Sequence, residues 1–168
     1  EARKIVVTAP LFSSDSAYAY TEAQLNFGTR EMNSKGHEAC AKYLIDEIKK
    51  FTDTTYVQKF EVKGVDGVNL KCTNIIASIN PNATSRILLT SHWDSRPWAD
   101  QDLKDKDKPI LSACDGASGV GTLIEIARAI LESLPAAEQP EGSRTTNLGY
   151  AIQRALTHAF YIFNKAYP

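Results

Sequence analysis

Two short runs of the sequence carry its most informative residues. They read Arg86-Ile-Leu-Leu-Thr-Ser-His-Trp-Asp-Ser95 and Ser112-Ala-Cys-Asp-Gly-Ala-Ser-Gly-Val-Gly121. The apolar residues 87–90 predict a buried strand, which delivers His92 and Asp94 to the carboxyl end where open α/β sheets bind their ligands. The second run predicts a helix starting near Ala117, with Asp115 at its mouth. Ligand-type residues at two successive element ends predict a metal site at this edge of the sheet.

The side chains at this edge suit a metal ion, but they also have a simpler interpretation. A neutral imidazole nitrogen of His92 and a carboxylate oxygen of Asp115 are both zinc ligands in proteins. Asp94 is placed to fix the tautomer of His92 through the other ring nitrogen. A hydrogen-bonded His–Asp pair that closes a strand end fits the same residues, and Asp115 also fits an ordinary helix N-terminus. The residues alone leave both interpretations open.

The order of the motifs along the chain resembles a known family. His92-Trp-Asp-Ser95, Asp115-Gly-Ala-Ser-Gly-Val-Gly121 and Leu123-Ile-Glu-Ile-Ala-Arg128 together resemble the zinc-dependent exopeptidase superfamily, which holds di-zinc aminopeptidases and glutaminyl-peptide cyclotransferases. Three further motifs are most similar to bacterial cyclotransferase-type members: Asn26-Phe-Gly-Thr-Arg30, His37-Glu-Ala-Cys-Ala-Lys-Tyr-Leu44 and Ser95-Arg-Pro-Trp-Ala-Asp-Gln-Asp102. The resemblance covers roughly residues 14–131.

This resemblance implies a fold, a site and a partner. The implied fold is α/β, a three-layer sandwich with a mixed central sheet flanked by helices, with the C-terminal half of the family fold missing. His92 and Asp115 match metal ligands of the di-zinc enzymes, with Asp115 as the bridging carboxylate, and Asp94 matches the catalytic residue that orients the histidine. The implied cofactor is zinc, either two ions or, in single-zinc cyclotransferases, one ion at the Asp115 position. The implied partner is a peptide N-terminus, and the implied location is extracytoplasmic, either periplasmic or secreted.

Two departures from the family pattern bear on activity. Cys114 stands where members usually have an asparagine before the bridging aspartate. Members also carry a Glu-Glu pair on the strand after this helix, supplying a general base and a metal ligand, and a later histidine ligand. After Asp115 this sequence has only isolated acids and one histidine: Glu125, Glu132, Glu138, Glu141 and His158. We therefore expect the second half of the site to be missing, and zinc binding to be weak or absent without further ligands.

Composition indicates one globular domain and excludes several classes of partner. The 168 residues are 43% hydrophobic, which is enough for a single core. A net charge of -1 gives no electrostatic case for nucleic acid or an anionic membrane. No apolar run approaches the roughly 20 residues of a membrane span. Three scattered cysteines fit either one disulfide with a free thiol or three buried thiols: Cys40, Cys72 and Cys114.

Hydrophobic periodicity predicts the helices and strands that precede residue 86. Ser13 begins an N-cap cluster, and Ser34 caps a second apolar-periodic segment. Runs of β-branched and aromatic residues flank a Gly-Val-Asp-Gly hairpin signal at residues 64–67. The predicted helices span about residues 15–25 and 34–50, and the predicted strands about 55–62 and 71–79.

Several other residues invite a functional interpretation. His37, in the first turn of the second predicted helix, is interpreted as a capping or surface residue rather than a ligand. Trp93 and Trp98 flank the predicted site, where a pocket wall and core packing both remain open. The glycines at residues 116–121 lack dinucleotide-binding spacing, so we interpret them as letting the helix approach the sheet closely.

The end of the chain departs from the family pattern. Residues 133–148 are rich in linker-type residues. Beyond them, apolar residues at helical spacing predict a C-terminal helix whose exposed 160–163 patch would favour self-association. The expected organisation is a partial zinc-exopeptidase-like domain at 1–132, a linker at 133–148 and a non-family helix at 149–168.

Three functions therefore remain open. The first is a zinc-dependent glutaminyl-peptide cyclotransferase, which cyclises an N-terminal glutamine. The second is a di-zinc aminopeptidase that releases N-terminal residues. Zinc count separates these two, because one ion leaves His92 unligated and two ions require it. The third is a non-catalytic fragment or interaction domain, which the missing Glu-Glu pair favours for this chain.

Overall fold

A computed structural model describes residues 10–133 and the backbone of residues 157–163. The two helices and two strands predicted before residue 86 are present, within a few residues of the predicted bounds. The elements are α1 (Ser14–Leu25), α2 (Lys35–Ile48), β1 (Thr54–Lys63), β2 (Asn69–Ser78), β3 (Arg86–His92), a short π-helical turn η1 (Ala113–Ala117), α3 (Ser118–Ser133) and β4 (Thr157–Phe163).

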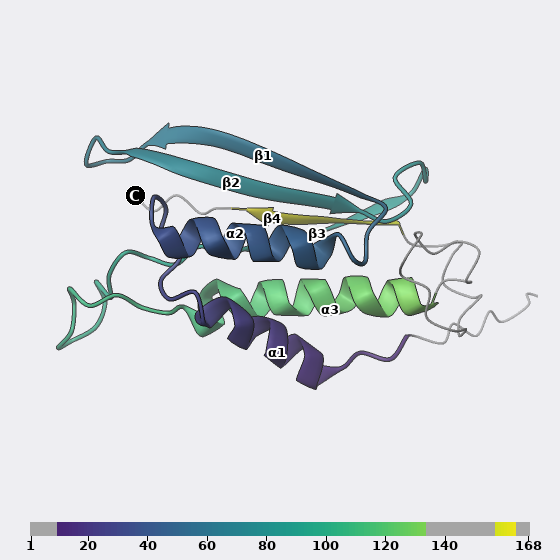
Figure 1. Cartoon of the computed structure of the whole chain (residues 1–168), viewed down its shortest axis with the longest axis horizontal. Coiled ribbons are helices and arrows are strands. Elements are labelled where there is room, and N and C mark those ends of the chain that lie inside the picture. Colours follow the sequence, from purple (N-terminus) through teal and green to yellow (C-terminus); the bar gives the residue numbers. More distant parts are fainter. Residues whose placement is uncertain (1–9, 134–156, 164–168) are drawn as a thin grey trace, which may run out of the picture.

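The described strands form one mixed sheet in the order β1-β2-β4-β3. β1 and β4 each run antiparallel to β2, while β3 runs parallel to β4. Figure 1 shows α2 and α3 on the same side of this sheet, with α1 packed against α3. The mixed α/β fold predicted from the sequence is confirmed. A second helical layer on the opposite face is not seen within residues 10–133 and 157–163.

The segment predicted as a C-terminal helix is a strand where it is described. β4 pairs Leu88 of β3 with Ala159 and Ile75 of β2 with Ile162. The helix prediction was therefore wrong for residues 157–163, and the self-association patch at 160–163 loses the helix on which it rested. A strand between two others is covered on both edges and tends to be apolar throughout, so its short apolar run mimics a buried helix. Residues 134–156 and 164–168, including nearly all of the predicted linker, lie outside the described residues.

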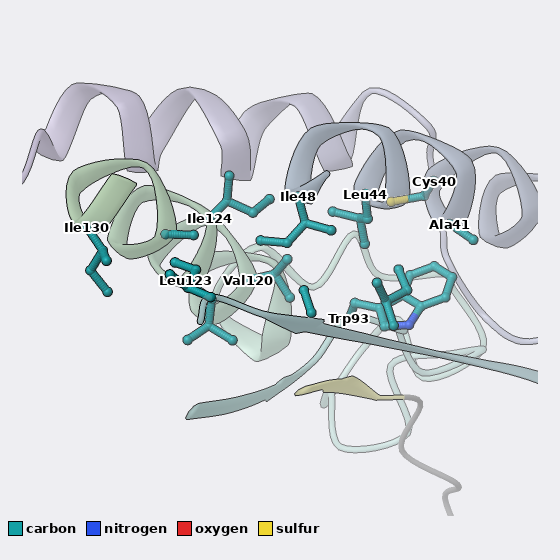
Figure 2. Close-up of a cluster of buried hydrophobic side chains, with 13 residues drawn as sticks. Cys40, Ala41, Leu44, Ile48, Trp93, Val120, Leu123, Ile124 and Ile130 are labelled. Carbon is teal, nitrogen blue, oxygen red and sulfur yellow. The ribbon is translucent and has the colours of Figure 1, made fainter. Parts of the chain in front are cut away.

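The core lies between the sheet and the two helices that cover it. The helices begin as predicted, because the Ser13 hydroxyl accepts from the Ser16 amide and the Ser34 hydroxyl accepts from the His37 amide at 3.0 Å. Figure 2 shows the apolar stripes of α2 and α3 meeting the sheet and the indole of Trp93. The buried cluster comprises Cys40, Ala41, Leu44, Ile48, Ile75, Ala77, Ile79, Trp93, Val120, Leu123, Ile124, Ala127 and Ile130.

Two glycines let the segment carrying Asp115 approach β3, as the sequence predicted. A Cβ atom on Gly116 would lie 2.9 Å from two ring atoms of His92 and overlap the His92 carbonyl oxygen. A Cβ atom on Gly119 would overlap the Ser91 side chain. Because contacts this short do not occur between real side chains, α3 can start beside His92 only with glycine at these positions.

The three cysteines are free thiols, so the disulfide alternative does not hold. Cys40 and Cys72 are buried, whereas Cys114 is exposed beside the predicted metal edge. The alternative of three buried thiols is therefore also wrong, at Cys114. In the described part of the chain, the helices are all too short or too polar to span a membrane.

Candidate metal centre

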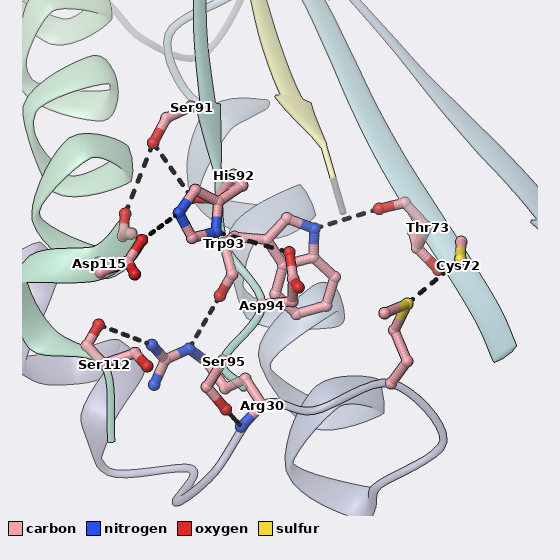
Figure 3. Close-up of polar contacts among 12 residues, drawn as sticks. Arg30, Cys72, Thr73, Ser91, His92, Trp93, Asp94, Ser95, Ser112 and Asp115 are labelled. Atoms are coloured by element: carbon pink, nitrogen blue, oxygen red, sulfur yellow. Dashed lines mark hydrogen bonds and ion pairs between the residues drawn. The ribbon is translucent and has the colours of Figure 1, made fainter. Parts of the chain in front are cut away.

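The structure brings the three predicted site residues together at the carboxyl end of β3. His92 is the last residue of β3, and η1 carries Asp115 to it from the start of α3. The His92 Nε2 atom lies 2.6 Å from Asp115 Oδ1, and its Nδ1 atom lies 3.6 Å from Asp94 Oδ1. Figure 3 shows the imidazole between the two carboxylates. Each ring nitrogen of His92 therefore faces one acid.

The two carboxylates differ in their exposure to solvent. The Asp94 side chain is fully buried, whereas the Asp115 side chain is 56% exposed and the His92 side chain 15% exposed. The hydrogen bond to Asp94 raises the pKa of His92, burial lowers it by a smaller amount, and Asp115 adds to the increase. Asp94 thus fixes the imidazole from inside the protein, and Asp115 meets it from the solvent side.

Arg30 joins the two segments that carry these residues. Its side chain is fully buried, with Nε donating to the Trp93 carbonyl at 3.0 Å and Nη2 donating to the Ser112 carbonyl at 3.2 Å. Its amide donates to the Ser95 hydroxyl at 2.7 Å. The sequence analysis named Arg30 only as the last residue of a family-like motif, because a fully buried arginine is rare and has no sequence signature of its own.

Trp93 and the histidine ring stacked on it belong to the core. Trp93 is fully buried and its Nε1 donates to the Thr73 carbonyl at 3.1 Å. Its ring stacks on His37, with centroids 4.3 Å apart and planes inclined by 22°. His37 is only 3% exposed, so the prediction of a capping or surface side chain is corrected. A histidine on the apolar side of a first helical turn can pack as an aromatic residue, which periodicity does not reveal.

The donor atoms of His92 and Asp115 are of the types that bind zinc in proteins. Imidazole nitrogen and carboxylate oxygen both bind zinc at about 2.0–2.2 Å, which places two ligands of a tetrahedral ion about 3.3 Å apart. The two atoms now lie 2.6 Å apart in a hydrogen bond, and both would hold an ion only if that bond were exchanged for bonds to the metal. A catalytic zinc takes about three protein ligands. Residues 10–133 contain no group of three or more metal-binding side chains, so they supply two donors.

A cleft adjoins this centre and opens onto Asp115. It has a volume of about 690 Å³ and is bounded by residues 31–33, the β1–β2 hairpin and the loop that follows Asp94. Trp98 lines it and is 53% exposed. The two tryptophans that flank the site therefore differ, since Trp93 packs in the core and Trp98 forms a cleft wall.

Comparison with known proteins places the chain among zinc exopeptidases and glutaminyl cyclases. Residues 74–143 match the model of peptidase family M28. The chain is 38% identical to a leucine aminopeptidase precursor from Bacteroides thetaiotaomicron, covering 95% of this chain and 49% of that one with a TM-score of 0.79. A search of curated proteins gives no match.

Two further solved structures are similar over the same extent. The glutaminyl cyclase of Bacteroides thetaiotaomicron is 38% identical, covering 94% of this chain and 48% of that one with a TM-score of 0.78. A Zn-dependent exopeptidase from Parabacteroides distasonis is 36% identical, with the same coverage and a TM-score of 0.76. The chain spans about half the length of these structures. With this fold and these motifs, the chain belongs to the zinc-dependent exopeptidase superfamily, the group of the aminopeptidases and glutaminyl-peptide cyclotransferases.

Proposed function

We propose that the protein is a zinc-dependent glutaminyl-peptide cyclotransferase in which Asp115 is a metal ligand. The contact between His92 Nε2 and Asp115 Oδ1 carries this proposal, because it keeps the histidine on the carboxylate as a hydrogen-bonding partner. That is the arrangement expected of a single-zinc enzyme, where His92 is not itself a ligand. The motif at residues 95–102 and the likeness to a solved glutaminyl cyclase support the same choice.

Cyclisation of an N-terminal glutamine joins the α-amine nitrogen to the side-chain amide carbon and releases ammonia. Zinc, when bound, polarises the carbonyl group of that amide. Asp115 would hold the ion, while the hydrogen bond from His92 fixes the direction of the Asp115 carboxylate. Asp94 would act one step further back, orienting the imidazole through Nδ1. A carboxylic acid passes the proton of the amine to the departing nitrogen, and none of the described residues is assigned to that step.

A di-zinc aminopeptidase is the second candidate. It is favoured by the position of His92, whose Nε2 lies beside the Asp115 carboxylate and would be available as a second ligand. The likeness to a leucine aminopeptidase precursor points the same way. The two candidates differ in the number of zinc ions and in the bond that is cleaved.

Zinc stoichiometry and product analysis test the proposal together. The purified chain is titrated with zinc and then incubated with a peptide that begins with glutamine. Loss of ammonia in the mass spectrum supports cyclisation, whereas a peptide shortened by one residue supports an aminopeptidase. Zinc binding at one ion per chain would rule out the non-catalytic fragment, and no binding would rule out both enzymes for this chain.

A matched pair of variants locates the metal ligand. Asp115→Asn keeps the size of the side chain but removes its charge, so zinc affinity should fall at least about tenfold. Asp107→Asn, an exposed aspartate in the loop between β3 and η1, should leave the affinity unchanged. Equal affinities in the two variants would remove Asp115 from the proposed site.

We also propose an extracytoplasmic location. The family resemblance supports it, as does the description of the similar leucine aminopeptidase as a precursor. Cell fractionation with detection of the protein by antibody tests this location, and recovery in the cytoplasmic fraction would contradict it.

A further inference from the structure

The cleft beside the metal centre has apolar walls that are open to solvent. Val65 and Val68 of the β1–β2 hairpin are 84% and 48% exposed, and Trp98 is 53% exposed on the facing loop. Apolar side chains grouped around a concave surface are typical of a binding site. Asp115 is one of the residues that line the cleft, so the cleft adjoins the centre where the proposed chemistry occurs.

The charges lining the cleft are mainly negative. Among the described residues that line it, Arg96 is the one cation, and its Nη1 atom lies 2.7 Å from Asp100 Oδ1. Arg96 and Asp100 neutralise each other, whereas Glu31 and Asp66 form no ion pair with any described residue. The cleft therefore has an excess of negative charge on an otherwise apolar surface.

Glu31 is the acid that most requires a partner. Its Oε2 atom is buried, and within the described residues no group donates a hydrogen bond to it. A carboxyl oxygen shielded from water without a donor is costly, so a cationic group of a ligand that reaches the Glu31 side chain in the cleft would be bound favourably. The cleft thus combines apolar walls with a carboxyl group that has one oxygen without a donor among the described residues.

We propose that this cleft binds the side chain of the second residue of the substrate peptide and prefers arginine or lysine there. This inference rests on the proposed function, because Asp115 places the N-terminal residue at the end of the cleft. The aliphatic stem of a basic side chain would lie against Val65, Val68 and Trp98, and its charged end would meet Glu31. Long basic side chains combine these two properties, and a tryptophan face attracts a cation as well.

Peptide binding to the full chain tests this preference without turnover. Trp98 reports binding through its fluorescence, since the other tryptophan is buried in the core. Three peptides beginning Gln-Arg, Gln-Leu and Gln-Glu, otherwise identical, are titrated in the presence of a zinc chelator. We expect the Gln-Arg peptide to bind about fivefold more tightly than Gln-Leu and the Gln-Glu peptide to bind most weakly, with the differences shrinking in high salt.

Variants assign the preference to the cleft. Glu31→Gln should remove most of the preference for Gln-Arg over Gln-Leu, and the exposed Asp66→Asn provides a second test if Glu31→Gln folds poorly. Asp107→Asn, outside the cleft lining, should keep the preference. Equal affinity for the three peptides, or a preference that both Glu31→Gln and Asp66→Asn retain, would overturn the proposal.

Zinc titration separates this inference from the proposed function. If the chain prefers the Gln-Arg peptide but binds no zinc, the proposed basic subsite is supported and the proposed cyclotransferase function is contradicted. If the chain binds zinc but shows no preference among the peptides, the proposed subsite is contradicted and the proposed metal centre is supported.

Discussion

The residues on the two sides of the His92 imidazole differ in how deeply they are buried. On the inner side, Asp94, Trp93 and Arg30 are fully buried. On the outer side, Asp115 and Trp98 are more than half exposed. The inner side is part of the folded core, whereas the outer side is held by a few contacts and is open to a ligand. Substitutions on the inner side should therefore reduce stability, and those on the outer side should change binding.

The two tryptophans provide the sharpest test of this difference. Trp93→Ala leaves a large cavity, breaks the bond to Thr73 and removes the ring stacked on His37, so the free energy of unfolding should fall by about 3–5 kcal/mol. Trp98→Ala should change it by less than about 1 kcal/mol, because the ring is half exposed. Urea denaturation measures both. Similar losses in the two variants would contradict the division into a firm inner side and an open outer side.

Arg30 should be the most important polar residue on the inner side. Arg30→Met keeps much of the side-chain volume but leaves the Trp93 and Ser112 carbonyls without their donors, so stability should fall by about 2–4 kcal/mol. Arg96→Met removes a surface ion pair with Asp100 and should cost at most about 1 kcal/mol. Thermal unfolding of both variants gives the comparison, and a smaller loss for Arg30→Met than for Arg96→Met would reverse it.

Thiol labelling compares the two sides without a substitution. Burial raises the pKa of Cys40 to about 12, so very little thiolate is present at neutral pH. Cys114, next to Asp115, is exposed. Iodoacetamide should modify Cys114 at least about 100-fold faster than Cys40 in the folded protein. Peptide mapping after timed labelling measures the ratio, which should approach one in denaturant.

The smallest expected effect is the dependence of stability on pH that comes from the titration of His92. Because the folded-state pKa of His92 is raised, its protonation stabilises the fold below the unfolded value of about 6.5, and this contribution is lost as pH rises through the folded pKa. Asp94→Asn removes the largest cause and should lower the titration midpoint seen by NMR. Asp107→Asn should leave it in place. A midpoint unchanged by Asp94→Asn would mean that the inner carboxylate does not set the charge of the imidazole.

The part of the fold that rests on local pattern was predictable from the sequence. Ser13 and Ser34 are side-chain caps in the structure, and the apolar stripe of α2 is buried as its periodicity indicated. β4 was not predictable in this way. Its run of apolar residues fits a helix or a strand equally, and its partners β2 and β3 lie about 70 residues or more earlier in the chain.

The site was predictable as a set of residue types but not as an arrangement. His92, Asp94 and Asp115 were named from their motifs, and the structure places them around one imidazole. The contribution of Arg30 depends on carbonyl groups of two distant segments, which no local pattern encodes. The cleft likewise exists only because the hairpin, the 31–33 loop and the loop after β3 meet in space.

The position of β4 has a consequence for the order of folding. Among the described strands, β4 is the hydrogen-bonded neighbour through which β3 joins the sheet. A ribosome therefore releases His92 well before it releases the strand that anchors β3, and the pairing of such distant segments is slow. His92, the last residue of β3, therefore joins this sheet only once β4 has paired with β2 and β3.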